Sequence, residues 1–206
     1  MSAIRNPIPP PRQERAHITR GRLLDAAVDE LVERGYAGFT TPSVAARAGV
    51  SRGAQQNHFP HKSVLIVEAV RHLATRQIHE LRSRVADVPP GRRRVELALE
   101  ILLDQYSGPL FVAVIDLSLA ARNDAYLRAV VTAEERNIAR EVQHSAKAIF
   151  GESFPKNTRE AERWSMVLST IRGLALLKLL GHSSTSVSRQ WTAVRPQLLK
   201  LLMEGI

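Results

Sequence analysis

The chain contains no cysteine among its 206 residues, and only 5% of its residues are aromatic. Without cysteine there are no disulfide bonds, no thiolate metal sites and no cysteine nucleophile. Long apolar runs are also missing, because the longest, residues 109–121, contains Asp116 and is too short to cross a bilayer. The N-terminus lacks the apolar core of a secretory signal. We therefore expect a cytoplasmic protein with no membrane partner.

Sequence motifs of catalysis and cofactor binding are also absent. We find no glycine-rich phosphate loop, no nucleophile elbow and no paired carboxylates. The seven histidines do not follow a zinc-binding spacing: His58 and His61 flank a proline, and His72 and His79 lie two helical turns apart. The sequence therefore predicts no catalytic residue, no metal site and no cofactor, and we do not expect an enzyme.

Positive charge is abundant in a chain of otherwise ordinary composition. The formal net charge is +9, with 44% hydrophobic and 24% charged residues, which favours a polyanionic partner such as nucleic acid. The first 62 residues hold nine Lys or Arg against five Asp or Glu, and the rest hold twenty against fifteen. Because the excess is spread over the chain, charge alone does not locate a binding site.

Apolar residues recur with helical spacing throughout, and no alternating strand pattern is present, so we predict an all-α fold. In the first predicted helix, residues 19–34, one face is apolar and Asp29, Glu30 and Arg34 lie opposite it. Gly35 follows at a usual stop position. The four prolines between residues 7 and 11 predict that residues 1–15 form a disordered basic tail, with a basic arm along DNA as the alternative.

Two short helices follow the first one. Thr41 is placed to cap a helix over residues 42–48, and Ser51 is placed to cap another that ends near Phe59. Between them, Gly49 permits a positive φ angle, and the small Ala45 allows the helices to cross closely. A long helix then opens at Lys62. We predict a helix-turn-helix DNA-binding domain over residues 16–62 and a helical ligand-binding and dimerisation bundle over residues 63–206.

The second short helix presents a polar face suited to the major groove of double-stranded DNA. Glutamine and asparagine bond adenine edges, arginine favours guanine, and polar groups at helix starts favour phosphates. The alternative is a solvated helical hairpin within a bundle. The candidate DNA-binding residues are Thr40, Thr41, Arg52, Gly53, Gln55, Gln56, Asn57, His58 and Lys62.

This region resembles the DNA-binding domain of the tetracycline-repressor (TetR) family. The resemblance covers residues 19–65, about a quarter of the chain, and its motifs are residues 35–36, 39–41, 44–51, 53 and 58–62. It implies that Thr41, Gly53, His58 and Lys62 lie on or near DNA. It also implies three N-terminal helices on DNA, about six more around a ligand pocket, and a homodimer formed through the last two long helices.

Gln55 departs from the family pattern, since an apolar residue usually occupies its position. Burying an unpaired amide costs about 1–3 kcal/mol. Gln55 must therefore find a buried partner, lay only its stem inward, or face the groove after a slight rotation of the helix.

Isolated polar groups in the C-terminal region are candidates for a small-molecule pocket. Asp116 follows an apolar run, and a buried carboxylate needs a partner or a proton; Arg172 is the partner we expect. Tyr106, Arg122 and Trp164 are expected to line the same cavity. The alternative is a structural salt bridge or helix cap.

Apolar stripes on the last two helices predict a homodimer built as a four-helix interface. The alternative is that both stripes belong to the core of one chain. The residues of the predicted interface are Trp164, Leu168, Ile171, Ala175, Trp191, Val194 and Leu198.

Together these features predict a ligand-responsive transcriptional regulator, a repressor that binds a palindromic operator as a dimer and is released by a small molecule. One alternative is an architectural DNA-binding protein without an effector. Another is a helical enzyme or carrier in which the N-terminal helices only dock a partner.

Overall fold

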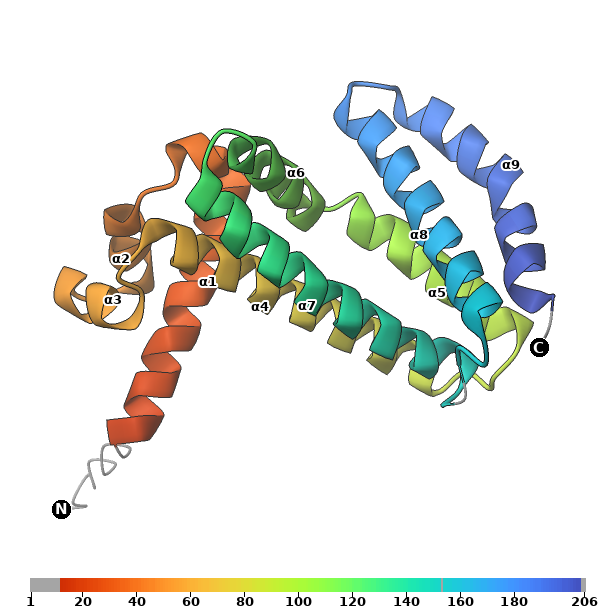
Figure 1. The fold of residues 1–206 in the computed structure, drawn as a ribbon, viewed down its shortest axis with the longest axis horizontal. Coiled ribbons are helices and arrows are strands. Elements are labelled where there is room, and N and C mark those ends of the chain that lie inside the picture. The colour runs from red at the N-terminus through yellow and green to blue at the C-terminus, as the bar shows by residue number, and fades with distance from the viewer. Residues whose placement is uncertain (1–11, 153, 205–206) are drawn as a thin grey trace, which may run out of the picture. The chain divides into compact units, whose positions relative to one another are not determined.

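The computed structural model describes residues 12–152 and 154–204, and within these ranges every regular element is a helix (Figure 1). The all-α fold class is therefore confirmed. The helices are α1 (Arg12–Gly38), α2 (Thr41–Ala48), α3 (Arg52–His58), α4 (Lys62–Ala86), α5 (Arg92–Tyr106), α6 (Pro109–Ala121), α7 (Ala125–Phe150), α8 (Thr158–Leu179) and α9 (Ser184–Met203).

The contacts divide the chain into two compact units, Met1–Ala69 and Val70–Ile206. Of the predicted tail, residues 1–11 lie outside the described residues, and the remainder is helical. α1 begins at Arg12 instead of Thr19, because no residue after Pro11 interrupts a helix in this segment. Gly35 has φ 62° and ψ −178°, which is not a helical conformation, so the regular helix breaks at the predicted stop and a short helical segment follows the kink to Gly38.

The core of the first unit forms where α1 packs against α2 and α2 against α3. Leu23 and Ala27 of α1 and Val44 and Ala45 of α2 are at most 1% exposed. The small side chain of Ala45 is buried in this core. Phe59, directly after α3, is also buried, so an apolar side chain holds the C-terminal end of α3 against this core.

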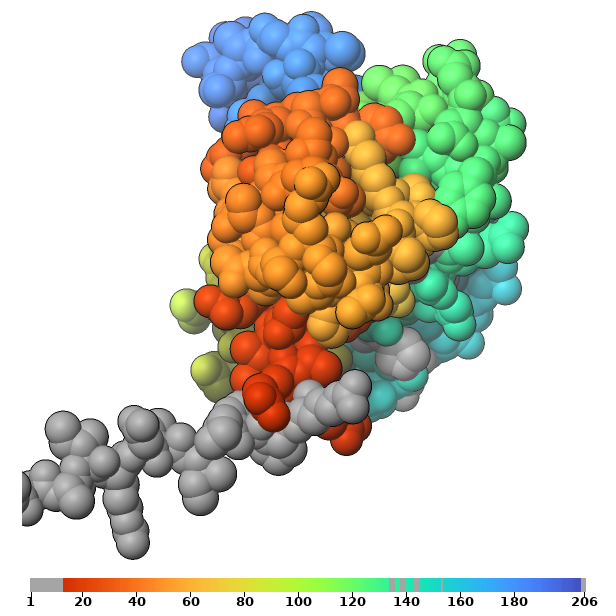
Figure 2. All heavy atoms as spheres, turned by 90° about the vertical axis from the view of Figure 1, so that its left-hand side faces the viewer, coloured from red at the N-terminus to blue at the C-terminus, as the bar shows by residue number. Residues whose placement is uncertain are grey.

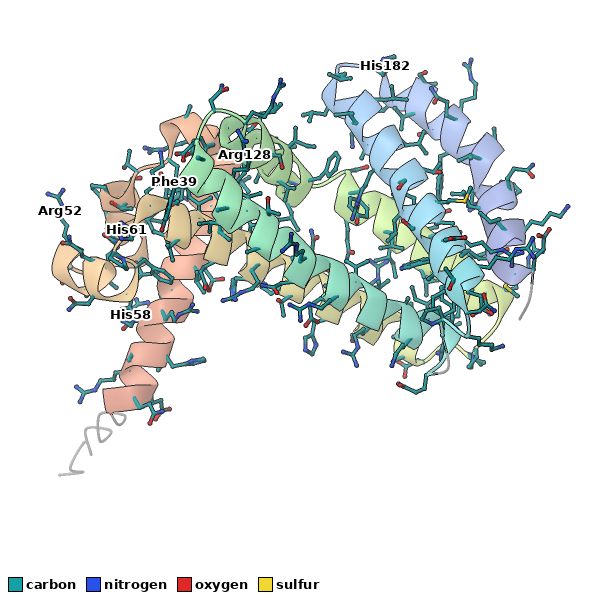
Figure 3. All side chains as sticks on the ribbon, viewed as in Figure 1. Phe39, Arg52, His58, His61, Arg128 and His182 are labelled. Carbon is teal, nitrogen blue, oxygen red and sulfur yellow. The ribbon has the colours of Figure 1, made fainter. Side chains whose placement is uncertain are left out.

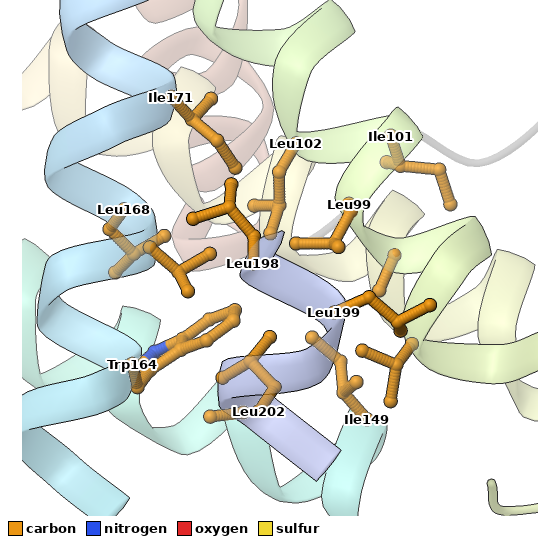
Figure 4. Close-up of a cluster of buried hydrophobic side chains, with 14 of the residues drawn as sticks. Leu99, Ile101, Leu102, Ile149, Trp164, Leu168, Ile171, Leu198, Leu199 and Leu202 are labelled. Carbon is orange, nitrogen blue, oxygen red and sulfur yellow. The ribbon is translucent and has the colours of Figure 1, made fainter. Parts of the chain in front are cut away.

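The core of the second unit lies between α5, α8 and α9 (Figure 4). Val95, Leu99 and Leu102 of α5 supply an apolar face that covers both C-terminal helices. As a result, most of the predicted dimer residues are buried inside one chain: Trp164, Leu168, Ile171, Ala175, Trp191 and Leu198, with Val194 half-buried beside them. The six buried residues belong to the core of one chain, as in the intrachain alternative, and this corrects their assignment to a dimer interface.

In the described ranges, no helix is by itself long and apolar enough to cross a membrane. α5 and α6 reach the required length and composition only as a pair, which is bent by 54°.

Candidate DNA interface and small-molecule cavity

The turn between α2 and α3 is built from local capping interactions. Thr40 is the N-cap of α2, and its Oγ1 accepts a hydrogen bond from the Ser43 amide at 3.2 Å, so the cap lies one residue earlier than the predicted Thr41. Gly49 ends α2 with φ 66° and ψ 37°, which confirms the left-handed turn. Ser51 caps α3 by accepting from the Ala54 amide at 3.1 Å, also as predicted.

α3 presents a short polar face to solvent. Arg52, Gly53, Gln56 and Asn57 are exposed, and Figure 3 shows Arg52 extending away from the neighbouring helices. In Figure 2 the atoms of this segment, in orange, lie on the surface of the first unit that faces the viewer. His58, the last residue of α3, is half-buried beside the Phe59 ring, with ring centroids 6.4 Å apart. A helix of this kind has the width and chemistry to enter a major groove.

Gln55 lies on the opposite face of α3 and is only 6% exposed. Its Nε2 donates a hydrogen bond to the Phe59 carbonyl oxygen at 2.8 Å. The amide therefore finds a buried partner, the first of the three arrangements that the sequence left open. Because the side chain points into the unit, we correct its inclusion among the DNA-contacting residues.

Replacing Gln55 with glutamate is expected to destabilise the first unit by about 1–3 kcal/mol, because a buried carboxylate would face the Phe59 carbonyl oxygen instead of donating to it. Chemical denaturation followed by circular dichroism measures this loss. Gln56→Glu, on the exposed face of the same helix, is the matched control and should leave stability within about 0.5 kcal/mol. Equal stability of the two variants would contradict the buried arrangement.

Lys62, at the start of α4, directs its ammonium group into the first unit. The Nζ donates to the Tyr36 carbonyl oxygen at 3.3 Å and lies 4.8 Å from the centroid of the Tyr36 ring. Burial lowers the pKa of this lysine. The sequence placed Lys62 on DNA, whereas these contacts indicate that it joins the start of α4 to the end of α1 and so positions the segment after α3.

A network of ion pairs that sequence reasoning missed joins α1 to α2. Glu30 was expected on the solvent face but is 2% exposed. It accepts hydrogen bonds from Arg47 Nε at 3.0 Å and from Ser43 Oγ at 2.7 Å. Arg47 also donates to Glu33, at 2.8 Å from Nη1 and again from Nη2. Arg47 thus forms ion pairs with carboxylates from two successive turns of α1. These ion pairs hold the orientation of α2 in addition to the apolar packing.

The same hydrogen bonds from Arg47 hold the pKa of Glu33 below its ordinary value, and those to Glu33 raise the pKa of Arg47. A carboxylate whose pKa is lowered on folding adds stability above its unfolded pKa, and this stability is lost as the pH falls through the folded value. The ion pair between Arg47 and Glu33 therefore stabilises the fold at neutral pH, and this stabilisation decreases on acidification.

Two further arginines of α1 lie beside the turn and α3. Arg20 donates to Glu68 at 2.6 Å, and its guanidinium lies 5.1 Å from the centroid of the Phe59 ring. Arg22 is exposed, and one of its terminal nitrogens lies 3.9 Å from where a Cβ on Gly49 would stand. Sequence reasoning missed both, because they lie outside the two short helices and only the packing of α1 brings them to the turn.

The second unit encloses a cavity of about 520 Å³ lined by α4, α5, α6, α7 and α8. Most of the lining is apolar, and its polar members include Tyr106 and Arg172, which the sequence nominated for a pocket. Three other nominated residues are not part of the lining. Arg122 is exposed at the end of α6, Trp164 is buried in the core against Phe150, and Asp116 is half-buried on α6.

Arg172 does not pair with Asp116 in the described part of the chain. Instead, Nε and Nη2 of Arg172 donate to the Tyr106 hydroxyl oxygen at 3.1 and 3.0 Å, and the guanidinium lies 5.2 Å from the centroid of the Tyr106 ring. The expected salt bridge is therefore replaced by a contact with a neutral phenol. Among the described residues, no group of three or more His, Cys, Asp or Glu side chains is arranged to hold a metal ion.

A left-handed glycine turn, two capped short helices and an exposed polar face on the second helix define a helix-turn-helix DNA-binding protein. Residues 23–69 match the family described as bacterial regulatory proteins, tetR family. A transcriptional regulator of the HTH type from Mycobacterium tuberculosis is 32% identical over 148 residues, which cover 71% of this chain and 76% of that protein. The HTH-type transcriptional regulator CymR of Pseudomonas putida is 32% identical over 167 residues, which cover 81% and 82%.

The fold also agrees with solved structures. The transcriptional regulator FadR from Bacillus subtilis, solved in complex with stearoyl-CoA, aligns with a TM-score of 0.63 at 18% identity, covering 90% of this chain and 98% of that one. The chain belongs to the tetR family. It is a DNA-binding transcriptional regulator and not an enzyme, as the sequence predicted.

Proposed function

We propose that this chain is a ligand-responsive repressor, which binds a palindromic operator as a homodimer and leaves it when a small molecule occupies the cavity. The observation that carries this proposal is the exposed polar face of α3, which the Gly49 turn and the inward amide of Gln55 direct to solvent. We assign DNA binding to residues 16–62, assign ligand binding and dimerisation to residues 63–206, and propose that the protein acts in the cytoplasm.

The exposed residues of α3 are the ones we assign to the operator. Arg52, Gln56 and Asn57 carry donors and acceptors that suit base edges, and Gly53 lets the helix backbone approach DNA closely. Thr40 and Thr41, at the start of α2, are assigned to phosphates, where helix N-terminal amides favour an anion. His58, half-buried, is assigned to the edge of this surface.

The dimer is proposed to form through the outer face of α8, opposite the core residues first nominated. Met166, Gly173 and Leu180 recur every seven residues on this face, and their neighbour Leu176 is also an exposed leucine. Met166 and Leu180 are 58% and 69% exposed. Large apolar side chains at this exposure, with a glycine at the centre, suit a close helix–helix contact with a second copy.

The cavity is the site we assign to the effector. Its volume of about 520 Å³ lies in the usual range of small-molecule sites, roughly 300–1,000 Å³. The FadR structure holds stearoyl-CoA, which supports ligand binding by a protein of this fold. A ligand that alters the spacing of the two α3 helices, about 34–36 Å on successive major grooves, would lower operator affinity, and such coupling typically amounts to about 1–3 kcal/mol.

Gly53→Glu is expected to abolish operator binding, with a loss of more than about 3 kcal/mol, because a carboxylate on the exposed face of α3 would meet the phosphates. A Cβ at Gly53 has no neighbour within 4 Å, so the fold should be unchanged. The measurement is fluorescence anisotropy against the DNA upstream of the protein's own gene and against a scrambled duplex.

Gly53→Ala is the control, with a much smaller loss and the same circular dichroism spectrum. If Gly53→Glu bound operator as the wild type does, α3 would not be the DNA-binding helix. If the wild type bound both duplexes equally, the architectural alternative would replace the operator-specific one.

A further inference from the structure

The lining of the cavity is chemically uneven. Its apolar members come from α4, α5, α6 and α7, and Leu81, Leu102, Phe111 and Ile115 are examples; α8 contributes only Arg172. Arg172 is the one charged side chain among the described residues that line it. A ligand that matches this lining has an apolar body and meets a positive charge at one place only.

The other polar groups of the lining are largely engaged within the protein. Ser118 Oγ donates to the Val114 carbonyl oxygen at 2.8 Å, and Ser145 Oγ donates to the Val142 carbonyl oxygen at 2.7 Å. Gln105 Nε2 donates to the Gln77 carbonyl oxygen at 2.8 Å. Both serine hydroxyl protons and one amide proton of Gln105 are therefore already donated to backbone oxygens, so these groups have less to offer a polar ligand group.

Arg172 and Tyr106 are arranged differently. Two guanidinium nitrogens converge on one phenol oxygen, at 3.1 and 3.0 Å. Arginine presents its donors as a planar fork, which matches the two oxygens of a carboxylate better than a single neutral oxygen. No described carboxylate lies within ion-pair distance of this guanidinium. The hydroxyl proton of Tyr106 can supply one further hydrogen bond to an anion held there.

From this arrangement we infer that the effector is an amphipathic monoanion, whose carboxylate binds Arg172 and Tyr106 and whose apolar body fills the cavity. The inference rests on the proposed role of this cavity as the effector site. Arg172 is an exposed residue, which places the carboxylate at the opening and the apolar body inside. A cationic ligand would be repelled by the positive charge of Arg172. An uncharged ligand would not attract the guanidinium away from the Tyr106 hydroxyl.

Three probes with the same ten-carbon tail separate the charge from the apolar body. We compare decanoate, decan-1-ol and decyltrimethylammonium below their aggregation concentrations, by isothermal titration calorimetry on the full chain. Decanoate is expected to bind about tenfold or more tightly than either of the others, because it alone completes charge-assisted hydrogen bonds to Arg172. 4-Butylbenzoate serves as an aromatic monoanion, and its affinity relative to decanoate tells whether the body is aromatic or aliphatic.

Substitutions test whether Arg172 and Tyr106 cause the preference for decanoate. Arg172→Gln should remove the preference for decanoate over decan-1-ol, while Arg172→Lys should retain part of it, because lysine keeps the charge but not the fork. Tyr106→Phe should weaken decanoate binding by a few fold without changing decan-1-ol binding. Ser118→Trp, which fills the cavity, should weaken all of the probes, and operator binding without ligand shows that each variant is folded.

The outcomes are distinct. A decanoate preference that Arg172→Gln removes supports the inference. If the three ten-carbon probes bind alike, if the ammonium binds best, or if Arg172→Gln leaves the preference intact, the monoanion inference is overturned and the cavity remains an effector site. If no probe binds, or if Ser118→Trp leaves the binding of every probe unchanged, the proposed effector role of the cavity fails as well, and the inference with it.

Discussion

Gly173→Trp is expected to give a folded monomer whose operator affinity is lower than that of the wild type by about 10²–10⁴-fold. A Cβ at Gly173 has no neighbour within 4 Å in the chain, so a tryptophan has room in the monomer. On the outer face of α8 it would separate two copies that approach through Met166, Gly173 and Leu180. The affinity falls because a dimer binds both half-sites of the operator with its two α3 helices, and two linked contacts bind far more tightly than one.

Light scattering with size-exclusion chromatography measures the mass of the particle, and anisotropy measures operator affinity. Arg93→Trp, at an exposed position on α5, is the matched control and should remain dimeric. A Gly173→Trp protein that stays dimeric would move the interface away from this face of α8, whereas a wild type that is monomeric at assay concentration would contradict the dimer itself.

Arg47→Met is expected to destabilise the first unit by about 2 kcal/mol and to weaken operator binding without affecting ligand binding. The substitution leaves the carboxylate of Glu30 buried with fewer donors. Removal of one partner from a buried ion pair typically costs about 3–5 kcal/mol. The cost here is lower because the Arg47 side chain is 30% exposed and Ser43 still donates to Glu30.

Hydrogen exchange of the α1 and α2 amides separates this structural effect from the loss of a DNA contact, since only loss of the network speeds exchange in free protein. Arg34→Met is the control, because Arg34 is 53% exposed and reaches Glu30 only at 3.4 Å. It should cost less than about 0.5 kcal/mol. Equal exchange rates in the two variants would show that Arg47 does not hold α2 on α1.

Local sequence rules were sufficient for the helix-turn-helix. The cap at Ser51 and the left-handed turn at Gly49 depend on residues within a few positions of each other, and the structure confirms both. The cap of α2 was misplaced by one residue, because Thr40 and Thr41 are chemically equivalent candidates. The helix that begins at Arg12 was missed, because the prolines before it dominate the composition of the segment.

Burial on a helix face required the tertiary structure. Periodicity identified apolar stripes on α8 and α9, but a stripe does not say whether a partner chain or another helix of the same chain covers it. α5 covers both, and the face left for a partner is the one that carries Met166, Gly173 and Leu180. Glu30 was likewise misread, because a residue at the edge of an apolar face is buried or exposed according to the helix that packs beside it.

Residue types and spacing thus determined most of the helices, the turn at Gly49 between α2 and α3, and nucleic acid as the class of partner. The helices and the turn depend on backbone preferences, and the class of partner depends on net charge. The pairing of side chains distant in sequence was decided by packing alone. Arg172 contacts Tyr106 instead of Asp116 because α8 lies beside the end of α5, and Arg47 binds Glu30 because α2 packs against α1. Such pairings depend on distances between helices, which no local pattern encodes.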